Sequence, residues 1–100
     1  MVEFERAILV AIKTGKLVFG SESAVESARS GKAKMIVVAS NCPGEVKSRI
    51  KKCAELSKVP VYEYSGSSLD LGSICQKRFV VAAVTVKEPG DSDIMKLVQG

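Results

Sequence analysis

The chain has 100 residues, of which 46% are hydrophobic and 26% charged, and its formal net charge is +4. These values indicate one domain with its own core, spanning residues 1–100, and exclude a disordered tail. The mild positive excess favours an acidic partner without demanding one. No apolar run approaches the ~20 residues that a membrane helix needs, and the amino terminus lacks a signal-peptide layout. We therefore expect a cytoplasmic protein.

The content of metal-binding and nucleophilic residues is also restrictive. The chain has no histidine, and its three cysteines form no Cys-x-x-Cys pair. This pattern argues against zinc, haem and disulfide frameworks and against histidine-dependent catalysis. We expect no enzyme activity, no metal and no cofactor, and we expect Cys42, Cys53 and Cys75 to be small hydrophobic residues of the core.

Helical and extended patterns alternate along the whole chain. In order, the predicted elements are a helix over 4–12, a strand over 16–19, a helix ending at Gly31, a strand over 35–40, a helix after Pro43, a strand over 59–64, a short helix ending at Ile74, a strand over 79–86 and a helical turn over 94–98. This alternation predicts a three-layer α/β/α sandwich with a central sheet of about four strands.

Short local signals mark where several elements begin. Ser23 and Glu26, like Ser67 and Asp70, have the spacing of a capping box and therefore predict helix starts. Pro60 has no N–H for a sheet ladder, so it predicts an edge strand or a first strand position.

The segment 35–41 suggests a binding site. Met35 to Ala39 is an unbroken apolar run, which predicts a strand buried on both faces. Asn41 follows at its carboxyl end, where ligands of open α/β sheets are bound. Gly20 ends the preceding strand in the same way, so the two residues would share one edge if their strands are neighbours. The alternative is that Asn41 only caps the next helix and Gly20 only permits a tight turn.

The segment 71–79 joins the short helix to the last strand. Ile74 and Cys75 could form an exposed apolar wedge, with Lys77 and Arg78 beside it for phosphates. Such a combination suits an unpaired, splayed nucleotide. The alternative is ordinary core burial of the two apolar residues, with two solvated charges next to them.

These segments resemble the L30e family of archaeal and eukaryotic large-subunit ribosomal proteins, which is part of the L7Ae group of kink-turn RNA binders. The matching segments occur in the family's order across nearly the whole chain. They are TGKLVFG (14–20), GKAKMIVVASNCP (31–43), CAELSKVPVY (53–62), LG (71–72) and PGDSDIM (89–95).

The resemblance implies that three loops bind RNA along one edge of the fold. In the family a glycine lets RNA approach the backbone, an asparagine contacts a guanine, and the third loop packs against an unstacked nucleotide. The corresponding RNA-binding residues here are Gly20, Ser21, Glu22, Asn41, Ile74, Cys75, Lys77, Arg78 and Phe79.

Three positions depart from the family pattern. Glu22 and Glu26 stand where many members have basic residues, and Val80 stands where some have arginine. A carboxylate near phosphate repels it. The resemblance therefore implies RNA binding that is weaker in isolation than for a strongly basic relative. The cations expected to compensate are Lys32, Lys34, Lys77 and Arg78.

The function expected from the resemblance is that of a structural, non-catalytic constituent of the large ribosomal subunit. Its partners would be ribosomal RNA, through a kink-turn or similar bent internal loop, and neighbouring ribosomal proteins, and the isolated chain would be a monomer. One alternative is a kink-turn adaptor of a non-ribosomal ribonucleoprotein, but Ser21-Glu22-Ser23 lacks the Thr-Asn-Glu type signature of that relative. A small-ligand-binding or enzymatic α/β domain is the other alternative, and the absence of histidine and of a phosphate loop argues against it.

Overall fold

The computed structural model describes residues 4–77, 80–92 and 94. The helices are α1 (Phe4–Thr14), α2 (Ser21–Ser30), α3 (Gly44–Ser57) and α4 (Ser68–Ile74), and the strands are β1 (Lys16–Phe19), β2 (Met35–Val38), β3 (Val61–Glu63) and β4 (Ala83–Glu88). The predictions for Arg78 and Phe79, and for a helical turn continuing over 95–98, lie outside the described residues. None of the helices in the described part has both the length and the apolar composition needed to cross a bilayer.

The four strands form one mixed sheet in the order β1-β4-β2-β3. β2 pairs with β3 in parallel, whereas β4 runs antiparallel to both β1 and β2. The carboxyl ends of β1, β2 and β3 and the start of β4 therefore lie at the same edge of the sheet. We call this edge the rim; it comprises Gly20, the segment 39–41, the segment 64–66 and the segment 80–82.

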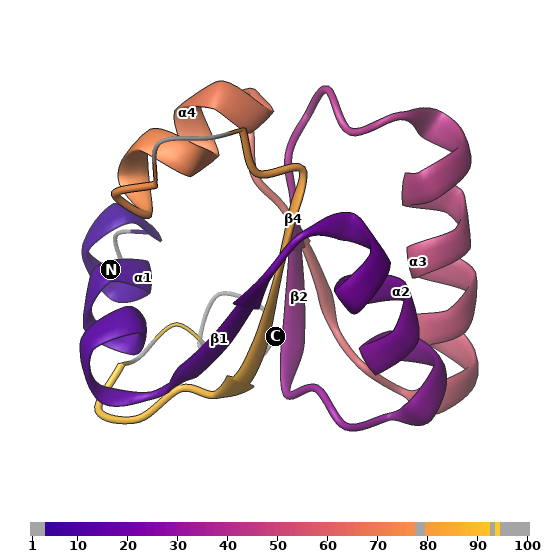
Figure 1. The fold of residues 1–100 in the computed structure, drawn as a ribbon. Helices are drawn as coiled ribbons and strands as arrows, with labels where there is room; N and C mark the ends of the chain where they lie inside the picture. Colours follow the sequence, from indigo (N-terminus) through magenta and orange to yellow (C-terminus); the bar gives the residue numbers. More distant parts are fainter. Residues whose placement is uncertain (1–3, 78–79, 93, 95–100) are drawn as a thin grey trace.

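Helices cover both faces of the sheet, so the predicted three-layer α/β/α sandwich is confirmed (Figure 1). α1 and α4 lie on one face, where Ile8, Val37 and Leu71 belong to a shared apolar cluster. α2 and α3 lie on the other face, where Ala28 and Ile50 pack with their own cluster. The expectation for segment 35–39 is also confirmed, because every residue of β2 is fully buried between the two helical layers.

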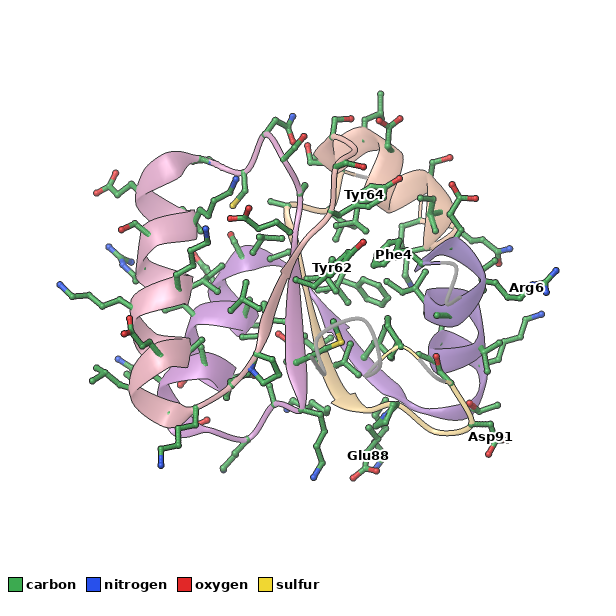
Figure 2. The ribbon with its side chains drawn as sticks, turned by 180° about the vertical axis from the view of Figure 1, so that it is seen from behind. Phe4, Arg6, Tyr62, Tyr64, Glu88 and Asp91 are labelled. Carbon is green, nitrogen blue, oxygen red and sulfur yellow. The ribbon has the colours of Figure 1, made fainter. Side chains whose placement is uncertain are left out.

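Aromatic residues pack against β3, the outermost strand on one side of the sheet. The ring of Phe4 stacks on Tyr62 and Tyr64, with centroid distances of 5.2 and 4.7 Å (Figure 2). These contacts fix the start of α1 against the edge strand. Pro60 immediately precedes this edge strand, as its missing N–H predicts, and its carbonyl oxygen accepts a hydrogen bond from the N–H of Ile36 at 3.0 Å.

One predicted capping box is present and the other is wrong. At α4, the Ser67 hydroxyl accepts from the Asp70 N–H at 3.2 Å, and the Ser67 N–H donates to the Asp70 carboxylate at 3.1 Å. At α2 the helix already begins at Ser21, so Ser23 lies inside it and caps nothing. The physical reason is that the Gly20 N–H donates to the Ala83 carbonyl at 2.9 Å, which leaves a single residue between β1 and α2.

The last strand begins later than the sequence predicted. The expected strand over 79–86 is observed as Ala83–Glu88. The N–H of Val81 donates to the Ser68 carbonyl of α4 at 3.0 Å rather than to a neighbouring strand, and Val80 is 61% exposed. The apolar segment before Ala83 therefore belongs to a loop and not to the strand, with Val80 exposed and Val81 buried. The other two shortened strands are β2 and β3, predicted over 35–40 and 59–64.

A buried hydroxyl in β4 leads to a stability prediction. Thr85 is fully buried, and its Oγ1 has no hydrogen-bond partner in the described part of the chain. Because an unpaired buried hydroxyl costs free energy, Thr85→Val should raise the free energy of unfolding by about 1 kcal/mol in urea titrations. Thr85→Ser is the control, since it keeps the hydroxyl, removes the methyl group and should lower stability. A Thr85→Val protein less stable than wild type would contradict this assignment.

Candidate nucleic-acid interface

The start of β4 holds the ends of β1 and β2 together at the rim. The N–H of Gly20 donates to the Ala83 carbonyl, and the N–H of Ala39 donates to the Ala82 carbonyl, both at 2.9 Å. The condition that β1 and β2 are neighbours is not met, because β4 lies between them. Gly20 and Asn41 nevertheless lie on one rim, since both follow strands that run in the same direction.

Gly20 adopts a backbone conformation that other residues rarely reach. Its φ of 119° and ψ of 148° belong to a region that is essentially restricted to glycine. A Cβ atom built at this position would meet nothing within 4 Å, so the surface beside the backbone is open. Among the described residues no side-chain hydrogen bond caps α2, and the backbone N–H groups at Ser21 and Glu22 lie in the first turn, where a helix has no internal acceptors for them. An anionic partner could therefore approach this backbone closely.

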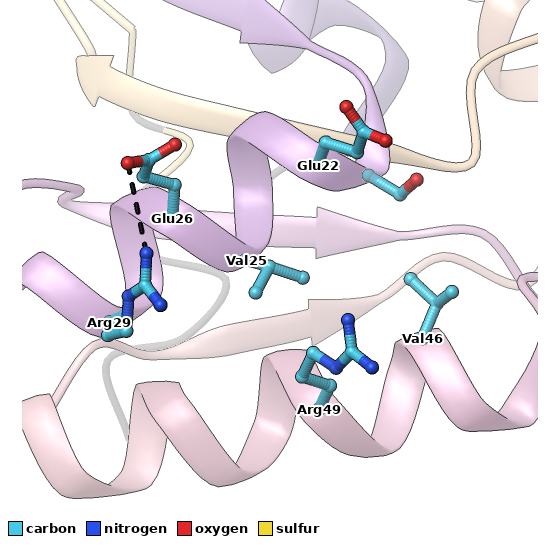
Figure 3. Close-up of a pocket in the computed structure, with 7 residues that line it drawn as sticks. Glu22, Val25, Glu26, Arg29, Val46 and Arg49 are labelled. Atoms are coloured by element: carbon cyan, nitrogen blue, oxygen red, sulfur yellow. Dashed lines mark ion pairs between the residues drawn. The ribbon is translucent and has the colours of Figure 1, made fainter.

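Acidic side chains of α2 lie next to this site. Figure 3 shows residues that line a hollow beside α2 and α3, among them Glu22 and Glu26 of α2 and Arg49 of α3. Glu26 forms an exposed ion pair with Arg29 at 3.8 Å. No ion pair of Glu22 is found in the described part of the chain. Glu22 is thus the carboxylate that would most directly repel a phosphate group brought to Gly20.

The side chain of Asn41 is hydrogen-bonded to α4 and not to α3, the helix that follows it in sequence. Its side-chain oxygen Oδ1 accepts a hydrogen bond from the N–H of Ser68, the first residue of α4, at 2.7 Å. The N-cap position of α3 is Pro43, and no side chain caps that helix. The alternative in which Asn41 caps the next helix is therefore wrong. Asn41 is exposed, and no partner of its Nδ2 group is found among the described residues.

The backbone next to Asn41 is fixed by a second loop. The N–H and the hydroxyl of Ser40 both donate to the Gly66 carbonyl, at 3.0 and 2.9 Å. The ammonium group of Lys47 donates to the Ser40 carbonyl at 3.3 Å. The two bonds of Ser40 hold the end of β2 against the loop between β3 and α4, and the bond from Lys47 joins it to α3.

The third loop of the family corresponds to the segment 73–79, and its described part, 73–77, is only partly exposed. Cys75 is 2% exposed and Ile74 is half-buried, and both pack with the cluster on the α1 face. Burial raises the pKa of the Cys75 thiol to about 11, although nearby Lys77 acts in the opposite direction. The exposed wedge formed by both side chains is therefore not observed, and the alternative of core burial holds for Cys75. Cys42 likewise has a free thiol and is buried, whereas Cys53 has a free thiol and is partly buried.

Of the cations expected to compensate, Lys77 is the one that the described structure brings next to Gly20. Its ammonium nitrogen lies 4.5 Å from the centroid of the Phe19 ring, directly before Gly20. This cation–π contact brings the third loop next to the first. Lys32 and Lys34 precede β2 and therefore lie at the opposite edge of the sheet, so they do not fill the expected role at this surface.

Two exposed apolar residues, one at the rim and one on the adjacent α4, escaped the sequence prediction. Leu69 is 67% exposed and Val80 is 61% exposed, and they flank the hydrogen bond between Val81 and Ser68. The sequence did contain a signal for Leu69, namely its position relative to the buried residues of the same helix. In a helix that starts at Ser68 and buries its later residues, Leu69 lies on the outward face. No local signal marked Val80, which reads as part of the strand.

The fold and the rim define a small α/β/α binding domain. Within residues 4–77, 80–92 and 94, no group of acidic or cysteine side chains is arranged to hold a metal ion. The chain belongs to the Ribosomal protein L7Ae/L30e/S12e/Gadd45 family, whose model matches residues 3–96. This result confirms the resemblance drawn from the sequence.

Individual relatives match along almost their whole length. The large ribosomal subunit protein eL30 of Methanothermobacter thermautotrophicus is 42% identical over 97 residues, which cover 97% of this chain and 99% of that protein. The eL30 protein of Methanothrix thermoacetophila is 46% identical over 99 residues, covering 99% and 92% of the two chains. A solved structure of a Bacillus halodurans protein with unknown function has a TM-score of 0.80 over 98% of this chain and 97% of its own. At 17% identity it supports the fold alone.

Proposed function

We infer that this chain is a non-catalytic, RNA-binding protein of the large ribosomal subunit, located on the ribosome in the cytoplasm. The observation that carries this conclusion is the 42% identity to large ribosomal subunit protein eL30, which extends over 97% of this chain and 99% of the relative. Because the match covers both chains almost completely, nearly every region of the relative has a counterpart in this chain. The binding partner at this level is ribosomal RNA.

We further propose that the RNA element is a kink-turn or a similarly bent internal loop, bound along the rim. Support comes from the placement of an open glycine backbone at Gly20, an exposed amide donor at Asn41 and a cation at Lys77 on one edge of the sheet. Such a surface suits recognition by shape with one or two base contacts. The proposed contact residues are Gly20, Ser21, Glu22, Asn41, Ile74, Lys77, Arg78 and Phe79, with Cys75 supporting Ile74 from the core. Neighbouring ribosomal proteins are the proposed further partners, and the isolated chain is proposed to be a monomer.

Electrophoretic mobility tests this proposal directly. The protein is titrated against a kink-turn RNA and against a duplex of the same composition with the internal loop replaced by Watson–Crick pairs. We expect binding to the kink-turn to be at least about tenfold tighter, because an unspecific basic surface would bind both RNAs equally. Equal affinities would overturn the kink-turn proposal and leave the ribosomal role to be explained by another RNA element.

The charge of Glu22 provides a second test of where RNA binds. Glu22→Gln should tighten kink-turn binding about three-fold at 0.1 M salt, because it removes repulsion of nearby phosphates, and the gain should shrink as salt is raised. Glu26→Gln is the matched control, since it changes the net charge equally but lies one helical turn farther from Gly20 and removes an acid already paired with Arg29. If both variants gained the same affinity, RNA would be sensing only the total charge.

A further inference from the structure

We propose that the backbone N–H of Ser68 is a positioning group for RNA recognition, which holds the Asn41 carboxamide so that its Nδ2 hydrogens, and not its oxygen, are presented to the RNA. This inference rests on the function proposed above. It assigns to α4 a role in base selectivity without requiring any α4 side chain to touch RNA.

The hydrogen bond itself determines which way the amide faces. Ser68 offers a backbone N–H, which can only donate, so the atom 2.7 Å away must be the amide oxygen of Asn41. The Nδ2 group then points away from Ser68 on an exposed residue. Two donor hydrogens therefore remain available on the surface of the rim.

Both ends of this hydrogen bond are fixed by further contacts. On the α4 side, the capping box of Ser67 and Asp70 closes the helix, and the Ser68 carbonyl accepts from Val81 at 3.0 Å. On the β2 side, Ser40 donates twice to the Gly66 carbonyl. Because neither end is free to move, the amide is held before RNA arrives, and less conformational entropy is lost on binding.

The fixed orientation has a chemical consequence for base choice. A free asparagine side chain can rotate and pair with either hydrogen-bond acceptors or donors on a base. Guanine presents acceptors at O6 and N7, whereas adenine and cytosine also present exocyclic amino donors. An amide that offers only donors therefore favours base edges that present acceptors, such as O6 and N7 of guanine or O4 of uracil, over edges that carry an exocyclic amino group. Loss of the Ser68 N–H should therefore reduce discrimination between bases as well as affinity.

Ser68 is suited to a clean substitution. It is the first residue of α4, a position at which proline is well tolerated because its N–H has no partner within the helix. The preceding Ser67 has a φ of −77° and a ψ of 172°, which is compatible with a following proline. Ser68→Pro thus removes the N–H that Asn41 accepts and leaves α4 in place. Ser68→Ala is the matched control, since it removes the side chain and keeps the N–H.

The decisive measurement compares three proteins on modified RNAs. Wild type, Ser68→Ala and Ser68→Pro are titrated against a kink-turn RNA and against versions in which each internal-loop guanine is replaced in turn by 2-aminopurine, which lacks O6. Wild type and Ser68→Ala should lose about tenfold in affinity at one guanine. Ser68→Pro should bind the unmodified RNA about five-fold more weakly and lose less than three-fold at that guanine. A merely structural defect would lower affinity for all RNAs equally and preserve the discrimination.

Two outcomes would overturn the inference while leaving kink-turn binding intact. One is a Ser68→Pro protein that discriminates as wild type does, and the other is a wild type that shows no loss at any modified guanine. Failure of the proposed function is a different result, namely wild-type protein that binds kink-turn and straight duplex equally. NMR of the wild-type protein provides a test independent of folding of the variants. A scalar coupling across the hydrogen bond, from the Ser68 nitrogen to the Asn41 side-chain carbonyl carbon, should be present with and without RNA, and its absence in the complex would disprove the positioning role.

Discussion

Replacing Asn41 with alanine is expected to weaken the complex with a kink-turn RNA by about tenfold or more, which corresponds to roughly 1–3 kcal/mol. The substitution removes the exposed Nδ2 donors at the rim together with the oxygen that accepts from Ser68. Because the Ser68 N–H is itself in an exposed region, water can replace that oxygen, and the free energy of unfolding should fall by at most about 1 kcal/mol. Binding titrations and urea denaturation measure the two effects separately.

The control for this prediction is the neighbouring residue. Ser40→Ala removes one of two hydrogen bonds to the Gly66 carbonyl and leaves the other, made by the backbone N–H, in place. Its RNA affinity should remain within about two-fold of wild type, since a single neutral hydrogen bond contributes little net free energy. If Asn41→Ala kept its affinity for RNA but lost several kcal/mol of stability, Asn41 would be a structural residue that joins β2 to α4 and nothing more.

Gly20→Ala should lower the free energy of unfolding by about 1–3 kcal/mol, because alanine is strained at a φ of 119° and a ψ of 148°. The variant should also weaken kink-turn binding beyond what its residual unfolding explains. Its methyl group would occupy the open space beside the backbone at which we propose that RNA approaches. Thermal unfolding gives the first effect, and RNA titration well below the melting temperature gives the second.

Gly44 offers a matched comparison for this prediction. It is the first residue of α3, and a Cβ atom there would likewise meet nothing within 4 Å, but its φ is not positive. Gly44→Ala should therefore stabilise the protein by about 0.4–1 kcal/mol through the unfolded state and leave RNA binding unchanged. Equal loss of stability in both variants would show that the strain assigned to Gly20 is wrong.

The central strand illustrates what local sequence predicts well. An unbroken apolar run such as Met35–Val38 is stable only when both faces of a strand are covered, and this requirement already implies helices on either side of the sheet. The box of Ser67 and Asp70 at α4 is likewise a purely local interaction over four residues, and it forms as expected. At α2 the same type of pattern failed, because a long-range bond from Gly20 to Ala83 decides where the helix begins.

Charge and apolar residues at the surface were harder to place. Lys32 and Lys34 stood next to the binding segment in sequence, yet the strand between carries them to the opposite edge of the sheet. Val80 continues an apolar run but lies on the surface, because Val81 bonds to α4 and so delays the start of β4. The position of Val80 depends on strand pairing, which neighbouring residues do not specify, whereas the position of Lys32 and Lys34 follows from the extended strand that the sequence already predicts.

By itself, the sequence determined the sandwich of helices and strands and the resemblance to the L30e family, and it singled out Gly20 and Asn41 as candidate binding residues. These features depend on apolar periodicity and on residues whose chemistry acts locally. The tertiary structure alone decided that β4 lies between β1 and β2 and that Asn41 accepts from Ser68. Asn41 and Ser68 are 27 residues apart in sequence and meet only because the parallel pairing of β2 with β3 carries the start of α4 to the end of β2.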